Sequence, residues 1–371
     1  MVEFITMAPT SGDSTLVGLA NNSTNLNSWT GVDGNTERPP TLEYIKAIAQ
    51  AAEKNGFSTL LLPTGAGCLD SLAVAANLIA HTNTLKFLFA IRPGFIAPTT
   101  FAKQFATVDY WSGGRALVNI VTGGSPIELA SEGDYLDHDT RYKRTREYIQ
   151  ILKKLFSEES VDYHGNFFSL KGASLFPKPV KNPQIYFGGA SEIAKEVAAE
   201  EVDVYMMWGE TLENTRHRIE EMKQKSAKYK RNLSFSVSFQ IILGKTEEEA
   251  WKNTKRLINR VSTPVLEKKE ELIVKGDSIG AQRLHQLMKN SKENNFKIGP
   301  NLWAGLTQVL SGNSIALVGT PDQIAEQIVE FVELGFDKVL LRGFPHLETI
   351  EQLGELVIPK VHKMLKQKQL A

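Results

Sequence analysis

The chain alternates short apolar runs with amphipathic windows of helical period along almost its whole length, and this pattern limits its fold more than any other feature. Runs of β-forming residues such as 59–62 are followed by segments in which apolar residues recur every three or four positions. Strands that alternate with helices usually pair in parallel. Eight such strands can be assigned, at 4–9, 59–62, 85–91, 116–121, 185–187, 204–207, 233–243 and 338–342. They predict an α/β fold of the (β/α)8 TIM-barrel type.

Four stretches depart from this alternation and are expected to be insertions. Residues 10–40 are polar and too long for an ordinary strand-to-helix turn, so they are a candidate lid. A second wide excursion carries Asp-His-Asp-Thr-Arg-Tyr at 137–142 and opens a helix, and 161–170 is predicted to be an appended hairpin. Residues 261–300 are highly charged and poor in apolar residues, which predicts a mobile insertion or lid. We therefore expect one barrel domain over 1–371 that contains the 261–300 segment.

Composition excludes several classes of protein. Forty-two basic residues balance forty-two acidic ones, so no overall field attracts nucleic acid or an anionic membrane. One cysteine, Cys68, excludes an internal disulfide and suits a reducing compartment. The first residues lack a leader pattern, and no apolar run is long enough to span a membrane. These features predict a soluble cytoplasmic protein.

One strand-to-helix junction predicts an anion site. Three bulky β-formers at 185–187 run into Gly188 and Gly189, and Ser191 then opens a helical pattern. Glycines let backbone N–H groups approach an oxyanion closely, and the serine can cap the helix or bond the anion at the positive helix end. Phosphate binding is the chemistry that this suggests. The structural alternative is a tight turn followed by a capped helix.

Reactive and polar residues gather where the predicted strands end. In a TIM barrel the active site lies at this end of the strands. Each of these residues also has a purely structural interpretation, as a small buried group, a packing residue or a hydrogen-bonded loop residue. The residues concerned are Cys68, Arg92, Thr122, Trp208 and His346.

A competing motif points to dinucleotide binding. Gly-Ala-Gly-Cys-Leu-Asp at 65–70 follows a strand and opens a helix, as a dinucleotide fingerprint does. Asp70 replaces its third glycine and would repel a pyrophosphate, and the next strand ends at Arg92 instead of at a ribose-binding acid. The sequence also lacks a P-loop, a His-Glu-x-x-His pair and a cysteine pair for zinc. We therefore expect no metal site.

Motifs in the same order along nearly the whole chain resemble the bacterial luciferase-like flavin monooxygenases, and most of all the alkanesulfonate monooxygenase group. The resemblance implies an enzyme that takes reduced FMN from a separate NAD(P)H-dependent flavin reductase. It further implies that O2 is a co-substrate, that one oxygen atom enters a small organic, for example organosulfur, substrate, and that the protein is a homodimer or homotetramer. The motifs are Leu-Pro-Thr-Gly at 62–65, Asn-Ile-Val-Thr-Gly at 119–123, the stretch 137–142, Tyr-Phe-Gly-Gly at 186–189, Pro-Asn-Leu-Trp-Ala-Gly at 300–305, Ala-Leu-Val-Gly at 316–319 and Pro-His-Leu-Glu at 345–348.

The same resemblance assigns roles by position. Cys68 and His346 match catalytic residues of the group. The positions that match contacts to the flavin, with its phosphate toward the fifth strand, are Ala90, Thr122, His138, Tyr142, Gly188, Gly189 and Ser191.

Four substrate-binding positions depart from the group. Its members that act on sulfonates carry two arginines, a histidine and a tyrosine where this chain has Ser238, Gln240, Leu310 and Phe344. Neutral or apolar groups cannot pair with a sulfonate, so a neutral substrate is expected unless Arg92 or Arg342 supplies the missing charge.

Two other functions stay open at this point. A barrel flavoprotein of the same superfamily can transfer hydride with a deazaflavin or flavin instead of activating oxygen. A flavin-binding protein that has lost catalysis is the other alternative, and the presence of both Cys68 and His346 argues against it.

Overall fold

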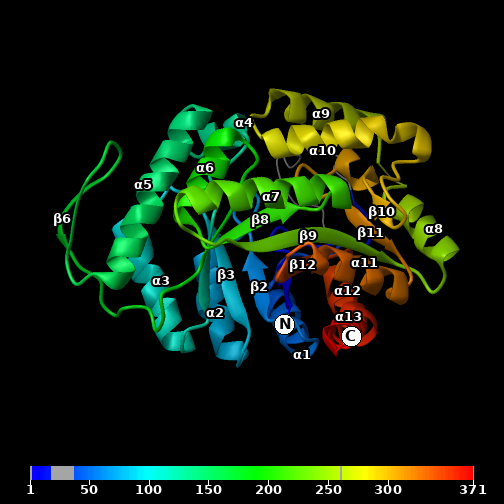
Figure 1. Cartoon of the computed structure of the whole chain (residues 1–371), viewed down its shortest axis with the longest axis horizontal. Coiled ribbons are helices and arrows are strands. Elements are labelled where there is room, and N and C mark those ends of the chain that lie inside the picture. Colours follow the sequence, from blue (N-terminus) through cyan, green and yellow to red (C-terminus); the bar gives the residue numbers. More distant parts are fainter. Residues whose placement is uncertain (1, 18–36, 260, 371) are drawn as a thin grey trace.

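A computed structural model describes residues 2–17, 37–259 and 261–370, and in them eight parallel strands close into a barrel (Figure 1). Each strand pairs in parallel with the next, and β12 closes the ring by pairing with both β9 and β1. The predicted TIM barrel and all eight predicted strands are confirmed. The barrel strands are β1 (Glu3–Met7), β2 (Thr59–Leu62), β3 (Lys86–Ile91), β4 (Ala116–Ile120), β7 (Ile185–Gly188), β8 (Val204–Trp208), β9 (Ser234–Leu243) and β12 (Lys338–Arg342).

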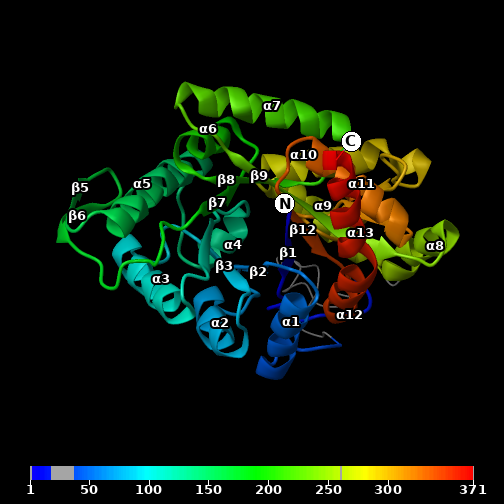
Figure 2. The ribbon, with the colours of Figure 1, turned by 60° about the horizontal axis from the view of Figure 1, so that its bottom comes forward.

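Helices surround the barrel, as the turned view shows (Figure 2). Their ends follow from local sequence: Thr320 and Gln323 form a capping box, and Asn55 ends the first helix. The helices are α1 (Leu42–Lys54), α2 (Ser71–Leu78), α3 (Pro98–Ser112), α4 (Pro126–Ser131), α5 (His138–Ser157), α6 (Glu192–Glu201), α7 (Leu212–Lys228), α8 (Glu247–Leu257), α9 (Thr263–Lys275), α10 (Ile279–Asn290), α11 (Pro321–Glu333), α12 (His346–Gln352) and α13 (Ile358–Leu370). Short 3-10 turns occupy Ile79–His81, Lys292–Asn294 and Gly305–Gln308, and a π-helical turn spans Leu353–Val357. In the described part of the chain, no helix is long and apolar enough to cross a membrane.

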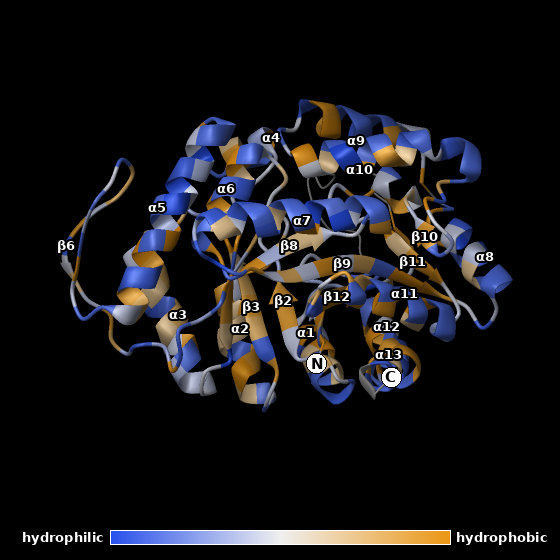
Figure 3. Cartoon of the chain, viewed as in Figure 1, coloured by the Kyte–Doolittle hydropathy of each residue, from blue (hydrophilic) through white to orange (hydrophobic). Residues whose placement is uncertain are grey.

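Strand alternation determines what faces the inside of the barrel. Apolar side chains from six strands fill one interior layer, and the strands are the most apolar part of the chain (Figure 3). Residues two positions further along a strand face the same side, so the next positions lie above this layer at the strands' C-terminal ends. They include Met7, Ala90 and Arg342, which form the floor of the site described below. The interior layer consists of Ile5, Leu61, Leu88, Tyr186, Val204 and Leu340.

Two strands were not predicted. β9 outlasts β8, and its last four residues, Gln240 to Leu243, pair instead with β11 (Ala316–Gly319). β11 in turn pairs with the two-residue β10 (Leu302–Trp303) in antiparallel orientation. The predicted hairpin is present as β5 (Val161–His164) and β6 (Ser169–Ala173), which project from the barrel (Figure 1).

The charged 261–300 segment, which was expected to be a mobile insertion, is largely helical. It forms α9 and α10, which lie over the strand ends (Figure 1). Val265, Ile273, Leu284 and Met288 are buried at helical spacing, and most charged residues of the two helices lie outside, although Lys269 is buried as well. The low apolar content of this segment therefore reflects two amphipathic helices, each of which buries one face. Of the predicted 10–40 lid, residues 18–36 lie outside the described part.

Candidate functional site

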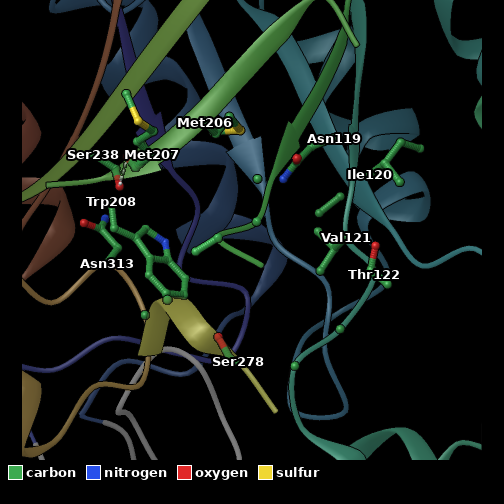
Figure 4. A pocket seen from close by; sticks show the side chains of 18 of the residues that line it. Asn119, Ile120, Val121, Thr122, Met206, Met207, Trp208, Ser238, Ser278 and Asn313 are labelled. Carbon is green, nitrogen blue, oxygen red and sulfur yellow. Dashed lines mark hydrogen bonds between the residues drawn. The ribbon is translucent and has the colours of Figure 1, made fainter. Parts of the chain in front are cut away.

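A cavity of about 270 Å3 opens at the C-terminal end of the barrel strands, under α10 (Figure 4). Its walls come from β3, β4, α5, the β7–α6 turn, β8 and the start of α10. All seven residues that sequence analysis assigned to cofactor binding line this one cavity: Ala90, Thr122, His138, Tyr142, Gly188, Gly189 and Ser191. The structure thus brings together positions that are up to 101 residues apart, from 90 to 191.

The β7–α6 turn leaves no room for a side chain. A Cβ atom on Gly189 would lie 2.5 Å from the Cβ of Ala194 and 3.3 Å from the hydroxyl of Tyr142. Ser191 caps α6, with its Oγ accepting a hydrogen bond from the N–H of Ala194 at 3.4 Å. The free N–H groups of the first helical turn therefore face a glycine-lined wall, which is a favourable place for an anion.

Tyr142 supplies a hydroxyl donor at this end of the cavity. Burial raises the pKa of Tyr142 to about 12, although a hydrogen bond from Ser191 opposes the rise. The phenol is therefore protonated at neutral pH and can donate. His138 packs against it, with ring centroids 4.8 Å apart.

Two arginines that sequence analysis missed add positive charge here. Arg218 Nη1 lies 3.2 Å from Glu210 Oε2, and Arg283 Nε lies 3.1 Å from the same oxygen. Both arginines line the cavity, and Glu210 is buried. Two guanidinium groups on one carboxylate leave the cluster with an excess positive charge beside the anion site. They come from α7 and α10. These helices carry many charged residues, so nothing in the sequence distinguishes these two arginines from the others.

The first turn of α10 forms part of the cavity wall. Asp277, which precedes it, is paired with the buried Arg141 of α5. A Cβ on Gly280 would lie 2.9 Å from the ring of Trp208, so the helix packs directly on this strand residue. The two contacts fasten α10 to opposite walls of the cavity.

His346 lies in a buried hydrogen-bond network with Asp13. Its backbone N–H and its Nδ1 contact the two carboxylate oxygens at 2.7 and 2.9 Å, and the Tyr44 hydroxyl donates to Asp13 at 2.5 Å. Burial tends to raise the pKa of Asp13, but the contacts to His346 and Tyr44 outweigh it and hold the pKa at about 2. The sequence did not indicate Asp13 as a site residue, because the 10–40 stretch has no motif and no regular hydrophobic spacing.

Burial also controls the charge of His346. It lowers the pKa of the imidazole, against the opposing influence of Asp13. Since ionised Asp13 accepts from Nδ1–H, Nε2 of the neutral ring carries a lone pair, and it has no partner among the described residues. His346 and Cys68 both lie outside the set of described residues that line the cavity.

Cys68 lies beside an arginine that is already paired. Arg92 holds Glu128 at 2.8 Å and Glu132 at 2.5 Å, so it is not available for a ligand. Burial raises the pKa of Cys68, which keeps the thiol protonated at neutral pH. A protonated thiol is a weak hydrogen-bond donor, not a nucleophile.

The four predicted substrate positions divide into two groups. Ser238 lines the cavity, and its Oγ donates to the carbonyl of Met207 at 3.4 Å (Figure 4). Gln240 lies behind, with its amide donating to the carbonyl of Asn313 at 2.8 Å. Leu310 packs in a separate apolar cluster, and Phe344 packs with its ring centroid 5.2 Å from that of His346. These three are not among the described residues that line the cavity.

Comparison with known proteins identifies the family and the fold. The model of the luciferase-like monooxygenase family matches residues 24–338. EDTA monooxygenase (EmoA) from Chelativorans sp. BNC1 superposes with a TM-score of 0.72 at 18% identity, over 98% of this chain and 94% of its own.

Two further solved structures share the fold. Riboflavin lyase (RcaE), solved with modified FMN and riboflavin, superposes with a TM-score of 0.75 at 19% identity, over 100% of this chain and 92% of its own. The coenzyme F420-dependent tetrahydromethanopterin reductase from Methanopyrus kandleri superposes with a TM-score of 0.65 at 17% identity, over 86% of this chain and 95% of its own.

Proposed function

The chain belongs to the luciferase-like monooxygenase family, and on this basis we propose that it is a two-component, FMN-dependent monooxygenase. A separate NAD(P)H-dependent reductase would supply the reduced flavin, and one atom of O2 would enter a small organic substrate. The observation that carries the proposal is the glycine-lined anion site at one end of a barrel cavity, with Tyr142, Ser191 and two arginines around it. Phosphate is the group that this site suits.

The polarity of the cavity lining supports a flavin. Ala90, Leu61 and Leu340 line the cavity with apolar side chains, as a ring system requires. Gly188 and Gly189 let the backbone pack closely where a side chain would not fit, because a Cβ on Gly188 would lie 3.1 Å from the carbonyl of Met206. The polar end of the cavity would therefore take the phosphate of FMN, and the apolar end would take its ring system.

When bound, reduced flavin would supply electrons and activate O2. The chain's own residues would bind and shield it: the apolar lining and the Gly280–Trp208 contact would exclude water from the reacting end. His346, held by Asp13, would accept or return a proton through Nε2. Cys68 would donate a weak hydrogen bond from its protonated thiol.

We expect the purified protein to be nearly colourless and to bind reduced FMN much more tightly than oxidised FMN, because a two-component enzyme borrows its flavin. Anaerobic titration with reduced FMN, followed by titration with oxidised FMN, measures both affinities. Isolation of the protein with stoichiometric, slowly released oxidised FMN would argue strongly against the proposal.

Hydride transfer with a deazaflavin is the second candidate. A groove of about 420 Å3 adjoins the anion site and shares Ala190, Arg218 and Arg283 with the cavity. Lys195 lines the groove as well, where it is paired with Glu192 and Glu221. Such a groove could hold the longer anionic tail of a cofactor like F420. Tighter binding of reduced F420 than of reduced FMN, with no oxygen consumption, would favour this alternative.

We expect α9 and α10 to become protected when flavin binds, because the start of α10 forms part of the cavity wall. Limited proteolysis or hydrogen exchange with and without reduced FMN measures this protection over residues 261–300. The β5–β6 hairpin, which projects from the barrel, serves as an internal control and should not change. Equal rates over α9 and α10 in both states would contradict the expected closure.

A further inference from the structure

Arg342 is a buried cation at the floor of the cavity. It is the last residue of β12, two positions beyond Leu340 of the interior layer, so its side chain enters the barrel. It is 3% exposed and lines the cavity. Its contacts are weak: Nη1 lies 3.6 Å from the sulfur of Met7, and the guanidinium lies 5.2 Å from the ring centroid of Phe344.

Arg342 differs from the other buried arginines of the chain. Arg92, Arg141 and Arg144 each hold a carboxylate through a terminal nitrogen. In the described residues, Arg342 makes no ion pair within 4.0 Å, and both its Nε and its Nη2 lack a hydrogen-bond partner. Burying a charged donor without an acceptor is costly, so the missing acceptor is expected to come from a ligand.

Asp13 balances the charge of Arg342 only at a distance. Its two carboxylate oxygens accept hydrogen bonds from Ser14, Tyr44 and His346. It therefore does not use the donors of Arg342. Burial lowers the pKa of Arg342 to about 10, so the guanidinium is still charged at neutral pH.

We propose that Arg342 binds a carboxylate group of the substrate through its Nε and Nη2 edge. These two N–H groups are parallel and match the two oxygens of a carboxylate. The proposal rests on the proposed function in taking this cavity as the place where substrate binds. It replaces the neutral substrate that the sequence favoured with an organic acid.

The neighbouring groups favour a carboxylate over a sulfonate. A sulfonate has a third oxygen, which would need another donor. Gln240 already donates to Asn313, and Ser238 donates to Met207. Nε2 of His346 presents a lone pair instead of a proton. Of these donor groups, Nε and Nη2 of Arg342 are the ones that lack a partner in the described residues, and this pair matches the two oxygens of a carboxylate.

Four probes of equal chain length test this: hexanoate, hexanamide, hexane-1-sulfonate and hexan-1-ol. Calorimetric titration of the full chain, flavin-free and anaerobically loaded with reduced FMN, measures their affinities. Hexanoate should bind about 10-fold or more tightly than hexanamide, as expected for charge-assisted hydrogen bonds. Arg342→Gln should abolish this preference, and Arg342→Lys, which keeps the charge but not the paired donors, should retain only part of it. Arg231→Gln is the matched control, because Arg231 pairs with Asp203 outside the cavity.

Several results would overturn the proposal. They are equal affinity of the unchanged protein for hexanoate and hexanamide, a preference that survives in Arg342→Gln, tighter binding of the sulfonate than of the carboxylate, and binding of none of the probes. Failure of the proposed function is recognised separately, because it shows as absent binding of reduced FMN. A carboxylate preference that depends on Arg342 in the flavin-free protein would still establish this site.

Discussion

Replacing Gly189 with alanine is expected to lower the affinity for FMN at least about 100-fold while the affinity for riboflavin stays the same. Loss of two charge-assisted hydrogen bonds, at roughly 1.5 to 3 kcal/mol each, has an effect of this size. The added Cβ would lie 2.5 Å from Ala194 Cβ, so the turn must move away from α6 and carry its N–H groups with it. Fluorescence titration with FMN and with riboflavin measures both affinities.

A double substitution separates the two possible causes. Ala194→Gly removes the atom that the new Cβ would meet, so Gly189→Ala combined with Ala194→Gly should recover much of the FMN affinity. Ala194→Gly alone is the control for the cost of a glycine within α6, about 1 kcal/mol. Equal affinity of the unchanged protein for FMN and riboflavin would show that the phosphate does not bind at this turn.

The barrel and the glycine turn that lines the cavity were predictable because their signals are local. The spacing of apolar residues predicts the alternation of strands and helices. Gly188 and Gly189 predict a turn without side chains. β11 was missed because its partner is the far end of β9, and nothing in residues 316–319 indicates that β8 stops short. A pairing between strands that are far apart in the sequence cannot be predicted from local residue patterns.

Residues at the site that were missed are contributed by segments without a motif. Arg218 and Arg283 lie on charged helices, and their importance follows only from their shared contact with Glu210. Conversely, Gln240, Leu310 and Phe344 were assigned by position, and three-dimensional packing places them behind the described cavity wall. Arg342 was one of two arginines considered, and the structure distinguishes them, because Arg92 is ion-paired and Arg342 lines the cavity.

Asp13→Asn is expected to lower the free energy of unfolding at pH 7 by about 3 kcal/mol, as for other broken buried polar networks. The carboxylate accepts from Tyr44, from Ser14 and from two donors of His346. An amide offers one acceptor oxygen, and its NH2 group would face a donor. Urea denaturation measures the loss. Tyr44→Phe, which removes one donor and keeps the carboxylate, should cost about 1 kcal/mol.

The pH dependence of unfolding identifies the carboxylate as the cause. The pKa of Asp13 is about 2 in the folded protein and 3.8 ordinarily, so its stabilisation is complete above pH 4 and is lost as the pH falls toward 2. That shift corresponds to about 2 kcal/mol. The lowered pKa of His346 acts in the same direction, because its neutral form is favoured in the fold and acid protonates it. Below pH 4 the difference in stability between the unchanged protein and Asp13→Asn should therefore shrink. The difference in stability between the unchanged protein and Tyr44→Phe should change less. A gap that stays constant from pH 7 to pH 3 would mean that Asp13 is not ionised in the fold, and that His346 is not held with its Nε2 lone pair free.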